Sequence, residues 1–143
     1  QNSKNLTEIM VAHELPYVAQ TTVGLWPDST NKFAKAFSIT GPKFINTYSP
    51  CVPGWGYHMS QTVTISKLAA ETRLWPCYEV ENGVYRITYK PKENVPIEEF
   101  LKIQTRFKHL LAPQNKPIIE SIQKTIDDRW KYLLMMEEAT NKK

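Results

Sequence analysis

Residues 17–48, YVAQTTVGLWPDSTNKFAKAFSITGPKFINTY, decide the fold of this chain. The runs 17–23 and 43–48 are rich in residues that favour β-strands. Between them we expect a helix that begins at Asp28 as its N-cap and ends before Gly41-Pro42. The apolar positions of this helix are Phe33, Ala36 and Phe37. A strand, a helix and a strand at this spacing form the βαβ unit of a parallel sheet, so the predicted fold class is α/β.

A further helix is expected before the first strand. Leu6, Ile9 and Met10 recur at helical spacing within residues 5–13, and Pro16 follows that stretch. Asn5 with Glu8 three positions later has the form of a helix N-terminal capping box.

The second half of the chain changes in character. We expect a helix from Ser60 to about Leu74, followed by a β-hairpin, because Asn82-Gly83 between two alternating runs favours a type I′ turn. Pro96 and Pro117 each open an amphipathic helix. The apolar faces are Ile97, Phe100, Leu101, Gln104, Phe107, Leu110 and Leu111 in the first, and Ile119, Ile122, Ile126, Trp130, Leu133 and Leu134 in the second.

These later elements have one-sided apolar faces, which must lie against another surface. That surface is either the preceding sheet or a partner subunit, unless the segment folds unaided. We therefore divide the chain into part of an α/β domain, residues 1–57, and a docking extension, residues 58–143.

Composition narrows the class of protein. The chain has 143 residues, 41% of them hydrophobic and 22% charged, which suits one domain or a compact part of a larger one. No apolar run approaches the roughly 20 residues of a membrane span, and no signal peptide is visible, so we expect a cytoplasmic protein. The chain begins at Gln1, which is expected of a truncated or processed product. The net charge of +4 is scattered, which favours a solvated surface over nucleic-acid binding.

The segment Ser49-Pro50-Cys51-Val52-Pro53-Gly54-Trp55-Gly56 is predicted to be a loop, because it holds two prolines and two glycines. Ligands of open α/β sheets gather just beyond the carboxyl ends of the strands, where Cys51 falls. From the residues alone, Cys51 is either a small buried apolar side chain or a metal ligand. Cys77 is expected to serve in packing, and two cysteines cannot make a four-thiolate site.

Four segments together resemble a known family. They are residues 4–19, the stretch GPKFINTYSPCVPGW at 41–55, the stretch LAAETRLWPCYE at 68–79, and FLKIQTRFKHL at 100–110. In this order they are similar to the C-terminal portion of the β, thiamine-diphosphate-binding, subunit of pyruvate:ferredoxin oxidoreductase and its 2-oxoacid:ferredoxin oxidoreductase relatives.

The resemblance implies a reaction and a site. Enzymes of this family decarboxylate a 2-oxoacid on thiamine diphosphate, transfer the acyl group to coenzyme A and pass electrons singly through [4Fe–4S] clusters to ferredoxin, reversibly. The cluster nearest the thiamine is held by four cysteines of one subunit, and the fourth lies in a Ser-Pro-Cys segment. Cys51 matches that fourth position and is therefore expected to be a ligand of the proximal [4Fe–4S] cluster.

Two family motifs are absent from this chain: the C-x-x-C pair of the cluster, and the Gly-Asp-Gly motif that binds Mg²⁺ and the diphosphate of thiamine diphosphate. The resemblance places both in the N-terminal half of the subunit. Alone, the chain is expected to be inactive, and no catalytic residue is assigned in it. The implied partners are that N-terminal half, subunits of the α, γ and δ types, ferredoxin, coenzyme A and the 2-oxoacid, without nucleic acid.

Two alternatives remain open at this point. The chain could be a non-catalytic structural or assembly module of the same family, with the hairpin and the two helices used for docking. It could also belong to a relative that acts on a branched-chain 2-oxoacid, 2-oxoglutarate or oxalate.

Overall fold

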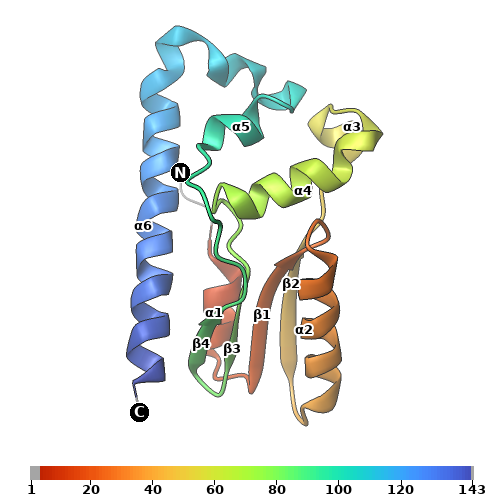
Figure 1. The fold of residues 1–143 in the computed structure, drawn as a ribbon, viewed down its shortest axis with the longest axis vertical. Helices are drawn as coiled ribbons and strands as arrows, with labels where there is room; N and C mark the ends of the chain where they lie inside the picture. Colours follow the sequence, from red (N-terminus) through yellow and green to blue (C-terminus); the bar gives the residue numbers. More distant parts are fainter. Residues whose placement is uncertain (1–3, 143) are drawn as a thin grey trace.

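A computed structural model describes residues 4–142 and arranges them around one four-stranded sheet (Figure 1). The α-helices are α1 (Leu6–Ala12), α2 (Trp26–Ser38), α3 (Val52–Trp55), α4 (Thr62–Glu71), α5 (Ile97–Leu101) and α6 (Lys116–Asn141). The strands are β1 (Tyr17–Thr22), β2 (Lys43–Tyr48), β3 (Tyr78–Glu81) and β4 (Val84–Ile87). Three 3₁₀ helices complete the fold: η1 (Met59–Gln61), η2 (Thr105–Leu111) and η3 (Pro113–Asn115).

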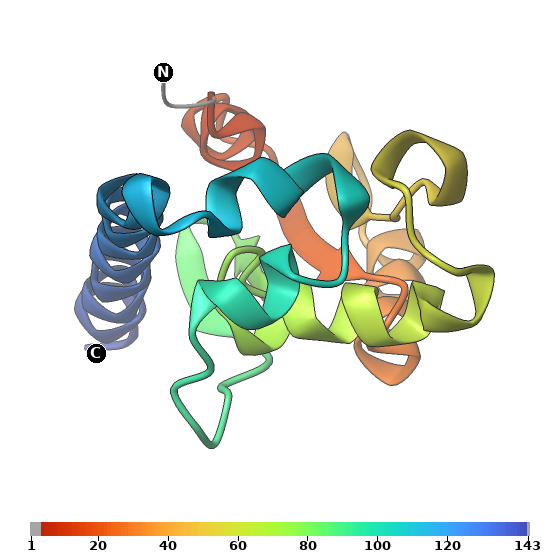
Figure 2. The same ribbon diagram turned by 90° about the horizontal axis from the view of Figure 1, so that it is seen from above.

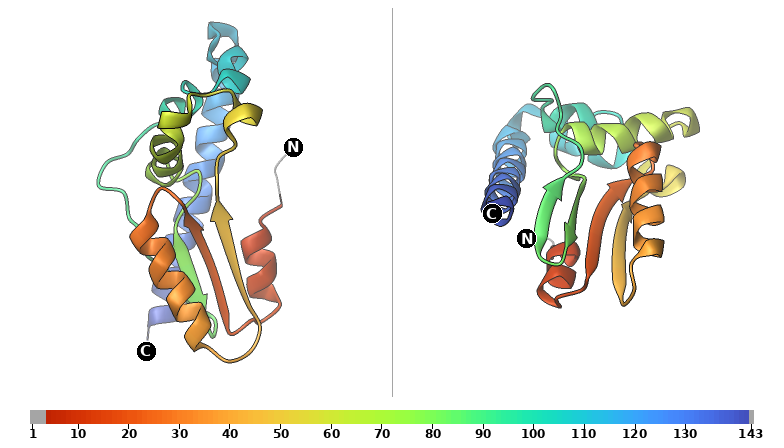
Figure 3. Two further views of the ribbon diagram at one scale, coloured as in Figure 1. Left: turned by 90° about the vertical axis from the view of Figure 1, so that its right-hand side faces the viewer. Right: turned by 60° about the horizontal axis from the view of Figure 1, so that its bottom comes forward.

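The predicted βαβ unit is confirmed. β1 and β2 pair in parallel, from Tyr17 opposite Lys43 to Thr22 opposite Tyr48, with α2 as the crossover. All six residues of β1 are buried because β1 is an inner strand with a helix on each face. Helix α2 covers one face and α1 the other, as Figure 3 shows in its left view. The fold class is therefore α/β, as predicted.

The hairpin is also confirmed, and it belongs to the same sheet. Asn82 and Gly83 have φ angles of 48° and 79°, the positive values that a type I′ turn requires. β3 pairs with β1 in the antiparallel sense, which gives the strand order β2-β1-β3-β4. The hairpin therefore extends the preceding sheet beside β1.

Helix α6 protects the outer edge of β4. The backbone N–H of Tyr85 donates to Oγ1 of Thr140 (3.0 Å), and that of Ile87 donates to Oε1 of Glu137 (2.7 Å). Leu133 of the same helix is buried against the hairpin. An edge strand whose donors are satisfied in this way is protected from pairing with another chain. No helix within residues 4–142 is long and apolar enough to cross a membrane.

The predicted single helix after Pro96 is wrong. It ends as α5 at Leu101, and a 3₁₀ segment, η2, follows. Gln104 between them is extended, with φ −109° and ψ 122°. Its buried side chain turns back and donates from Nε2 to the carbonyl oxygen of Phe100 (2.8 Å), and Thr105 is bound to a distant loop. The local bond of Gln104 and the long-range bonds of Thr105 therefore override the apolar periodicity.

Two helix starts were also misplaced by the sequence. α2 begins at Trp26, and Asp28 lies in its first turn, where its carboxylate accepts from Oγ1 of Thr21 (2.6 Å). α4 begins at Thr62 after the turn η1, and it ends at Glu71 rather than near Leu74. It ends early because Arg73 has a left-handed φ of 61°, which no α-helix accommodates.

The N-terminal cap of α1 is half confirmed. Oδ1 of Asn5 accepts a hydrogen bond from the backbone N–H of Glu8 (3.3 Å), as the cap requires. The Glu8 side chain points elsewhere, to the hydroxyls of Tyr78 and Tyr85. A full capping box is therefore not formed, because Glu8 instead joins α1 to the hairpin.

Candidate functional site

Cys51 lies beyond the carboxyl ends of β1 and β2, where the two parallel strands meet. The N–H of Val23, just after β1, donates to the carbonyl oxygen of Tyr48, the last residue of β2 (3.2 Å). Cys51 follows three residues later, with an exposed thiol. Helices α4 and α5 lie across the same end of the sheet (Figure 2). Cys51 therefore occupies the position at which α/β sheets bind ligands.

The Cys51 segment is more regular than the predicted loop. Cys51 is the N-cap of the one-turn helix α3, and its carbonyl oxygen accepts from the N–H of Trp55 (3.0 Å). Gly56 ends the turn in a left-handed conformation, with φ 66° and ψ 62°. Proline is tolerated in the first turn of a helix because those N–H groups have no partner in the helix, so Pro53 fits.

Gly54 lies close to the Cys51 sulfur. A Cβ at this position would lie 3.3 Å from Sγ of Cys51, which is tighter than an ordinary contact. Glycine therefore lets the backbone approach the sulfur without a side chain pressing against it.

An aromatic cluster supports the loop from below. The Tyr48 ring lies 5.5 Å from Trp55 and 5.3 Å from Trp75, centroid to centroid, and Phe100 is 6.5 Å away. Nε1 of Trp75 donates to the carbonyl oxygen of Thr21 (2.8 Å), which ties the cluster to β1. Burial raises the pKa of Tyr48 well above its ordinary value, so the hydroxyl stays neutral. The loop thus packs on partly buried aromatic rings that are tied to the sheet.

The sequence reasoning missed two residues that contact this loop from far along the chain. Thr105 donates from its backbone N–H (3.0 Å) and from Oγ1 (2.6 Å) to the carbonyl oxygen of Gly56. The guanidinium of Arg106 lies 3.9 Å from the ring centroid of Trp55. In the sequence, both residues lie in the stretch 100–110, which carries part of the family resemblance and is predicted to be helical. Neither residue belongs to the predicted apolar face of that helix.

The donor set fits one ligand of a metal cluster. Cys51 is exposed, whereas Cys77 is fully buried, and burial raises the pKa of the Cys77 thiol to about 12. Both are free thiols, and the prediction that Cys77 serves in packing is confirmed. Within residues 4–142, no group of three His, Cys, Asp or Glu side chains could hold a metal ion. Cys51 is therefore the one exposed thiol among the described residues.

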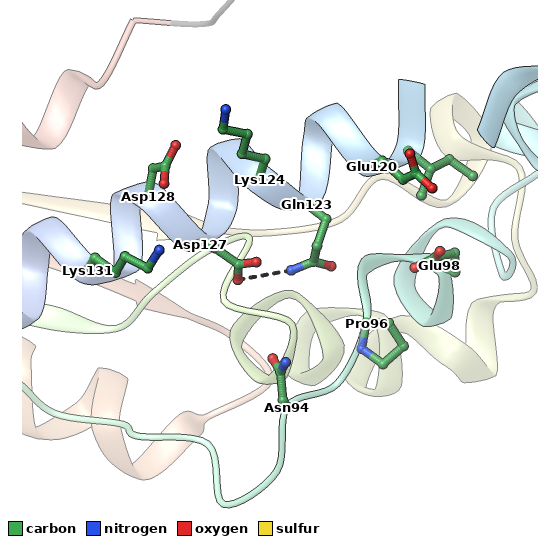
Figure 4. A pocket seen from close by; sticks show the side chains of 10 residues that line it. Asn94, Pro96, Glu98, Glu120, Gln123, Lys124, Asp127, Asp128 and Lys131 are labelled. Carbon is green, nitrogen blue, oxygen red and sulfur yellow. Dashed lines mark hydrogen bonds between the residues drawn. The ribbon is translucent and has the colours of Figure 1, made fainter. Parts of the chain in front are cut away.

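Two polar hollows lie away from Cys51. One, of about 490 Å³, lies between α6 and the segment before α5, with side chains of both charges including Glu98, Asp127 and Lys131 (Figure 4). The other, of about 610 Å³, contains Lys32, whose ammonium donates to Asp28, Thr88 and the carbonyl oxygen of Gln20. Burial lowers the pKa of Lys32. The Lys32 ammonium thus finds all three acceptors within the fold. The polar side chains that line this second hollow therefore form an internal ion-pair network.

An apolar surface covers the outside of α2. Phe37 is 85% exposed, Trp26 is 72% exposed, and an apolar hollow of about 490 Å³ is lined by Val23, Phe33 and Thr47 together with Trp26. Of the predicted apolar positions of α2, only Ala36 is buried against the sheet. This surface adjoins β2, which is one edge of the sheet.

No protein-family model matches the chain, but curated proteins do. It is 47% identical over 144 residues to pyruvate synthase subunit PorB of Thermotoga maritima, covering 100% of this chain and 44% of that protein. It is 48% identical over 130 residues to PorB of Methanocaldococcus jannaschii, covering 91% of this chain and 42% of that protein. The chain belongs to the β-subunit family of the 2-oxoacid:ferredoxin oxidoreductases.

A second group of relatives in the same β-subunit family has a different name. The chain is 37% identical over 141 residues to ketoisovalerate oxidoreductase subunit VorB of Pyrococcus furiosus, covering 97% of this chain and 44% of that protein. This β-subunit chain thus spans less than half the length of the curated relatives it matches.

Proposed function

We propose that this chain is the C-terminal portion of the β subunit of a cytoplasmic pyruvate:ferredoxin oxidoreductase. In the proposed reaction, pyruvate, coenzyme A and two oxidised ferredoxins give acetyl-CoA, carbon dioxide, two reduced ferredoxins and a proton, reversibly. The observation that carries the proposal is the exposed Cys51 thiol, which follows the carboxyl end of β2. All of this chain is similar to part of a PorB subunit.

Cys51 is the proposed fourth ligand of a [4Fe–4S] cluster. An exposed thiol is a suitable iron–sulfur ligand once deprotonated, and the absence of a side chain at Gly54 keeps the sulfur free of a contact 3.3 Å away. The other three thiolates, the thiamine diphosphate and its Mg²⁺ belong to the N-terminal half of the subunit in this proposal. When bound, the thiamine stabilises the carbanion of decarboxylation and the cluster accepts electrons singly.

The residues of this chain position the Cys51 side chain and pack aromatic rings against the inner side of its loop. The one-turn helix α3 sets the direction of the Cys51 side chain, and Tyr48, Trp55 and Trp75 shield the inner side of the loop. An apolar surround of this kind lowers the local dielectric and influences the potential of a nearby cluster.

The N-terminal half of the subunit is the proposed cover of β2 and of the apolar surface of α2. The two edges of the sheet differ: α6 satisfies the donors of β4, whereas β2 lies beside exposed Trp26 and Phe37. Apolar patches of this kind mark interaction sites. The division into residues 1–57 and 58–143 remains a prediction about the longer subunit, as do the subunits of α, γ and δ types and the ferredoxin partner.

Pyruvate is the proposed 2-oxoacid. The chain shares more residues with the PorB relatives than with the VorB relatives, which supports pyruvate over ketoisovalerate. The test is turnover of the purified complex with each 2-oxoacid, coenzyme A and a low-potential acceptor. A higher kcat/KM for ketoisovalerate than for pyruvate would refute this assignment.

The decisive experiment for the site is Cys51→Ser in the assembled oxidoreductase. We expect loss or conversion of the proximal [4Fe–4S] signal in electron paramagnetic resonance, with thiamine diphosphate still bound. Cys77→Ala is the matched control, because Cys77 is buried in packing and its loss is expected to leave the iron content unchanged. An unchanged cluster signal in Cys51→Ser would refute the ligand assignment.

A further inference from the structure

The helix that carries Cys51 is too short to hold its own shape. α3 has four residues, and helices of so few residues are unstable in water because nucleation costs more than the first hydrogen bonds return. Its position is therefore determined by what it contacts. Some contacts are near in sequence, such as that between Trp55 and Tyr48. The long-range contacts come from Thr105 and Arg106, at the start of η2, about fifty residues further along the chain.

Thr105 anchors the end of the Cys51 turn. Both of its hydrogen bonds reach one atom, the carbonyl oxygen of Gly56, at 3.0 Å from N and 2.6 Å from Oγ1. The approach is so close that a Cβ at Gly56 would lie 2.8 Å from Cβ of Thr105. Gly56 is thus required both by its left-handed φ and by the space that Thr105 occupies.

Arg106 holds the other side of the same turn. Its guanidinium lies over the Trp55 ring (3.9 Å to the centroid) and near the Phe107 ring (4.4 Å). Nε of Arg106 donates to Oε1 of Gln104 (3.0 Å), and Gln104 is itself buried and bound to the carbonyl of Phe100. A cation over an indole face is attracted by the ring quadrupole. The hydrogen bond to Gln104 fixes the plane of the Arg106 guanidinium.

We infer that Thr105 and Arg106 are positioning residues for Cys51. The pair, which we call the η2 clamp, acts on Trp55 and Gly56, and through α3 it fixes the place of the Cys51 sulfur. The inference rests on the proposed role of Cys51 as a cluster ligand. Groups bonded directly to a metal ligand orient it, and their loss typically costs 10- to 100-fold in metal affinity. Thr105 and Arg106 act one contact further out, through Gly56 and Trp55, so that range is the upper bound for them.

The test uses four variants of the assembled oxidoreductase. Thr105→Val keeps the shape and the backbone hydrogen bond but removes the Oγ1 donor, and Thr105→Ser keeps that donor. Arg106→Met removes the cation, and Lys108→Met is its matched control, because Lys108 is exposed and two residues away. The measurements are the rate of iron loss to a chelator, the midpoint potential and resonance spectrum of the cluster, and the thermal midpoint.

We expect Thr105→Val and Arg106→Met to speed iron loss several-fold, up to roughly 10- to 100-fold, and to alter the spectrum and the potential. Thr105→Ser and Lys108→Met are expected to match the unchanged protein. Because Arg106 is exposed, its variant should fold, so the test stands even if Thr105→Val does not assemble.

The outcomes separate the two proposals. A normal spectrum, potential and iron-loss rate in Arg106→Met and Thr105→Val, with a lost signal in Cys51→Ser, overturns the clamp and leaves the proposed function standing. A retained signal in Cys51→Ser overturns the ligand assignment itself, whatever the clamp variants show. A change in iron loss that merely follows a lower thermal midpoint, with an unaltered spectrum and potential, also overturns the clamp.

Discussion

The hydroxyl of Tyr78 donates a hydrogen bond of 2.6 Å to the carboxylate of Glu8, seventy positions earlier in the chain. The Tyr85 hydroxyl donates to the other oxygen of the same carboxylate (2.8 Å), and the two tyrosine rings stack at 6.2 Å. Glu8 thus joins α1 to both strands of the hairpin. This half-buried carboxylate accepts from two buried phenols and, at 3.4 Å, from the hydroxyl of Tyr132, so it is a structural anchor of the sheet.

Glu8→Ala should destabilise the protein by about 2 to 4 kcal/mol, because it leaves two poorly solvated phenol donors without their acceptor. Urea unfolding measures the change. Glu93→Ala, at an exposed position, is the control and should alter the free energy of unfolding by less than about 0.5 kcal/mol. Equal effects of the two substitutions would contradict the anchor role.

Alkaline pH should unfold the protein through Cys77. Burial raises the pKa of this thiol from 9.0 to about 12, so between these values the unfolded chain has lost a proton that the folded chain still holds. Stability therefore falls as pH rises from about 9 toward 12, by on the order of 1 kcal/mol per pH unit from this group. Well below pH 9 the thiol is protonated in both states and contributes no pH dependence.

The measurement for Cys77 is urea unfolding across pH 8 to 11, a range chosen around the pKa shift above. Cys77→Ala should reduce the slope of stability against pH. Part of the slope should remain, because burial also raises the pKa of Tyr17 and Tyr85 above the ordinary tyrosine value. An identical slope in the variant would show that Cys77 does not contribute.

Gly24 and Gly83 should respond very differently to alanine. A Cβ at Gly24 would lie 2.5 Å from the backbone N of Lys67 and 2.7 Å from the backbone C of Ser66, so backbone must move. Gly83 has open space around it and only its φ of 79° opposes alanine. We expect a cost of about 3 kcal/mol or more for Gly24→Ala and about 1 kcal/mol for Gly83→Ala.

Thermal or urea unfolding of both glycine variants checks this order. A smaller loss of stability in Gly24→Ala than in Gly83→Ala would mean that the turn after β1 and α4 do not approach each other as closely as the structure has them.

Phe37→Glu should impair assembly without unfolding the chain. Phe37 is almost fully exposed on α2, and a surface substitution usually alters stability by about 0.5 kcal/mol or less. If the N-terminal half of the subunit covers this surface, a buried charge should weaken its association by at least about tenfold. Co-purification of the two parts measures this, with Asn31→Glu, at an exposed position elsewhere on α2, as control. Undiminished co-purification would place the partner elsewhere.

Local sequence signals were sufficient for elements whose backbone conformation is determined by neighbouring residues. The strand at 43–48 was predicted with its true bounds, because β-branched and aromatic residues there are bounded by Gly41-Pro42 and Pro50. The hairpin was predicted because Asn82 and Gly83 are residue types that readily adopt the positive φ angle required at both central positions of a type I′ turn. The Cys51 position beyond a strand end followed from the same two strands.

Other features depended on contacts between residues far apart in the sequence. By itself, the sequence determined the βαβ unit, the hairpin and the place of Cys51, because turn chemistry and periodicity act over a few residues. Only the tertiary structure decided that η2 leaves the helical path at Gln104 and that Thr105 and Arg106 hold the turn of Cys51. The physical reason is that a hydrogen bond between Thr105 and Gly56 spans 49 positions and leaves no periodic trace in the sequence.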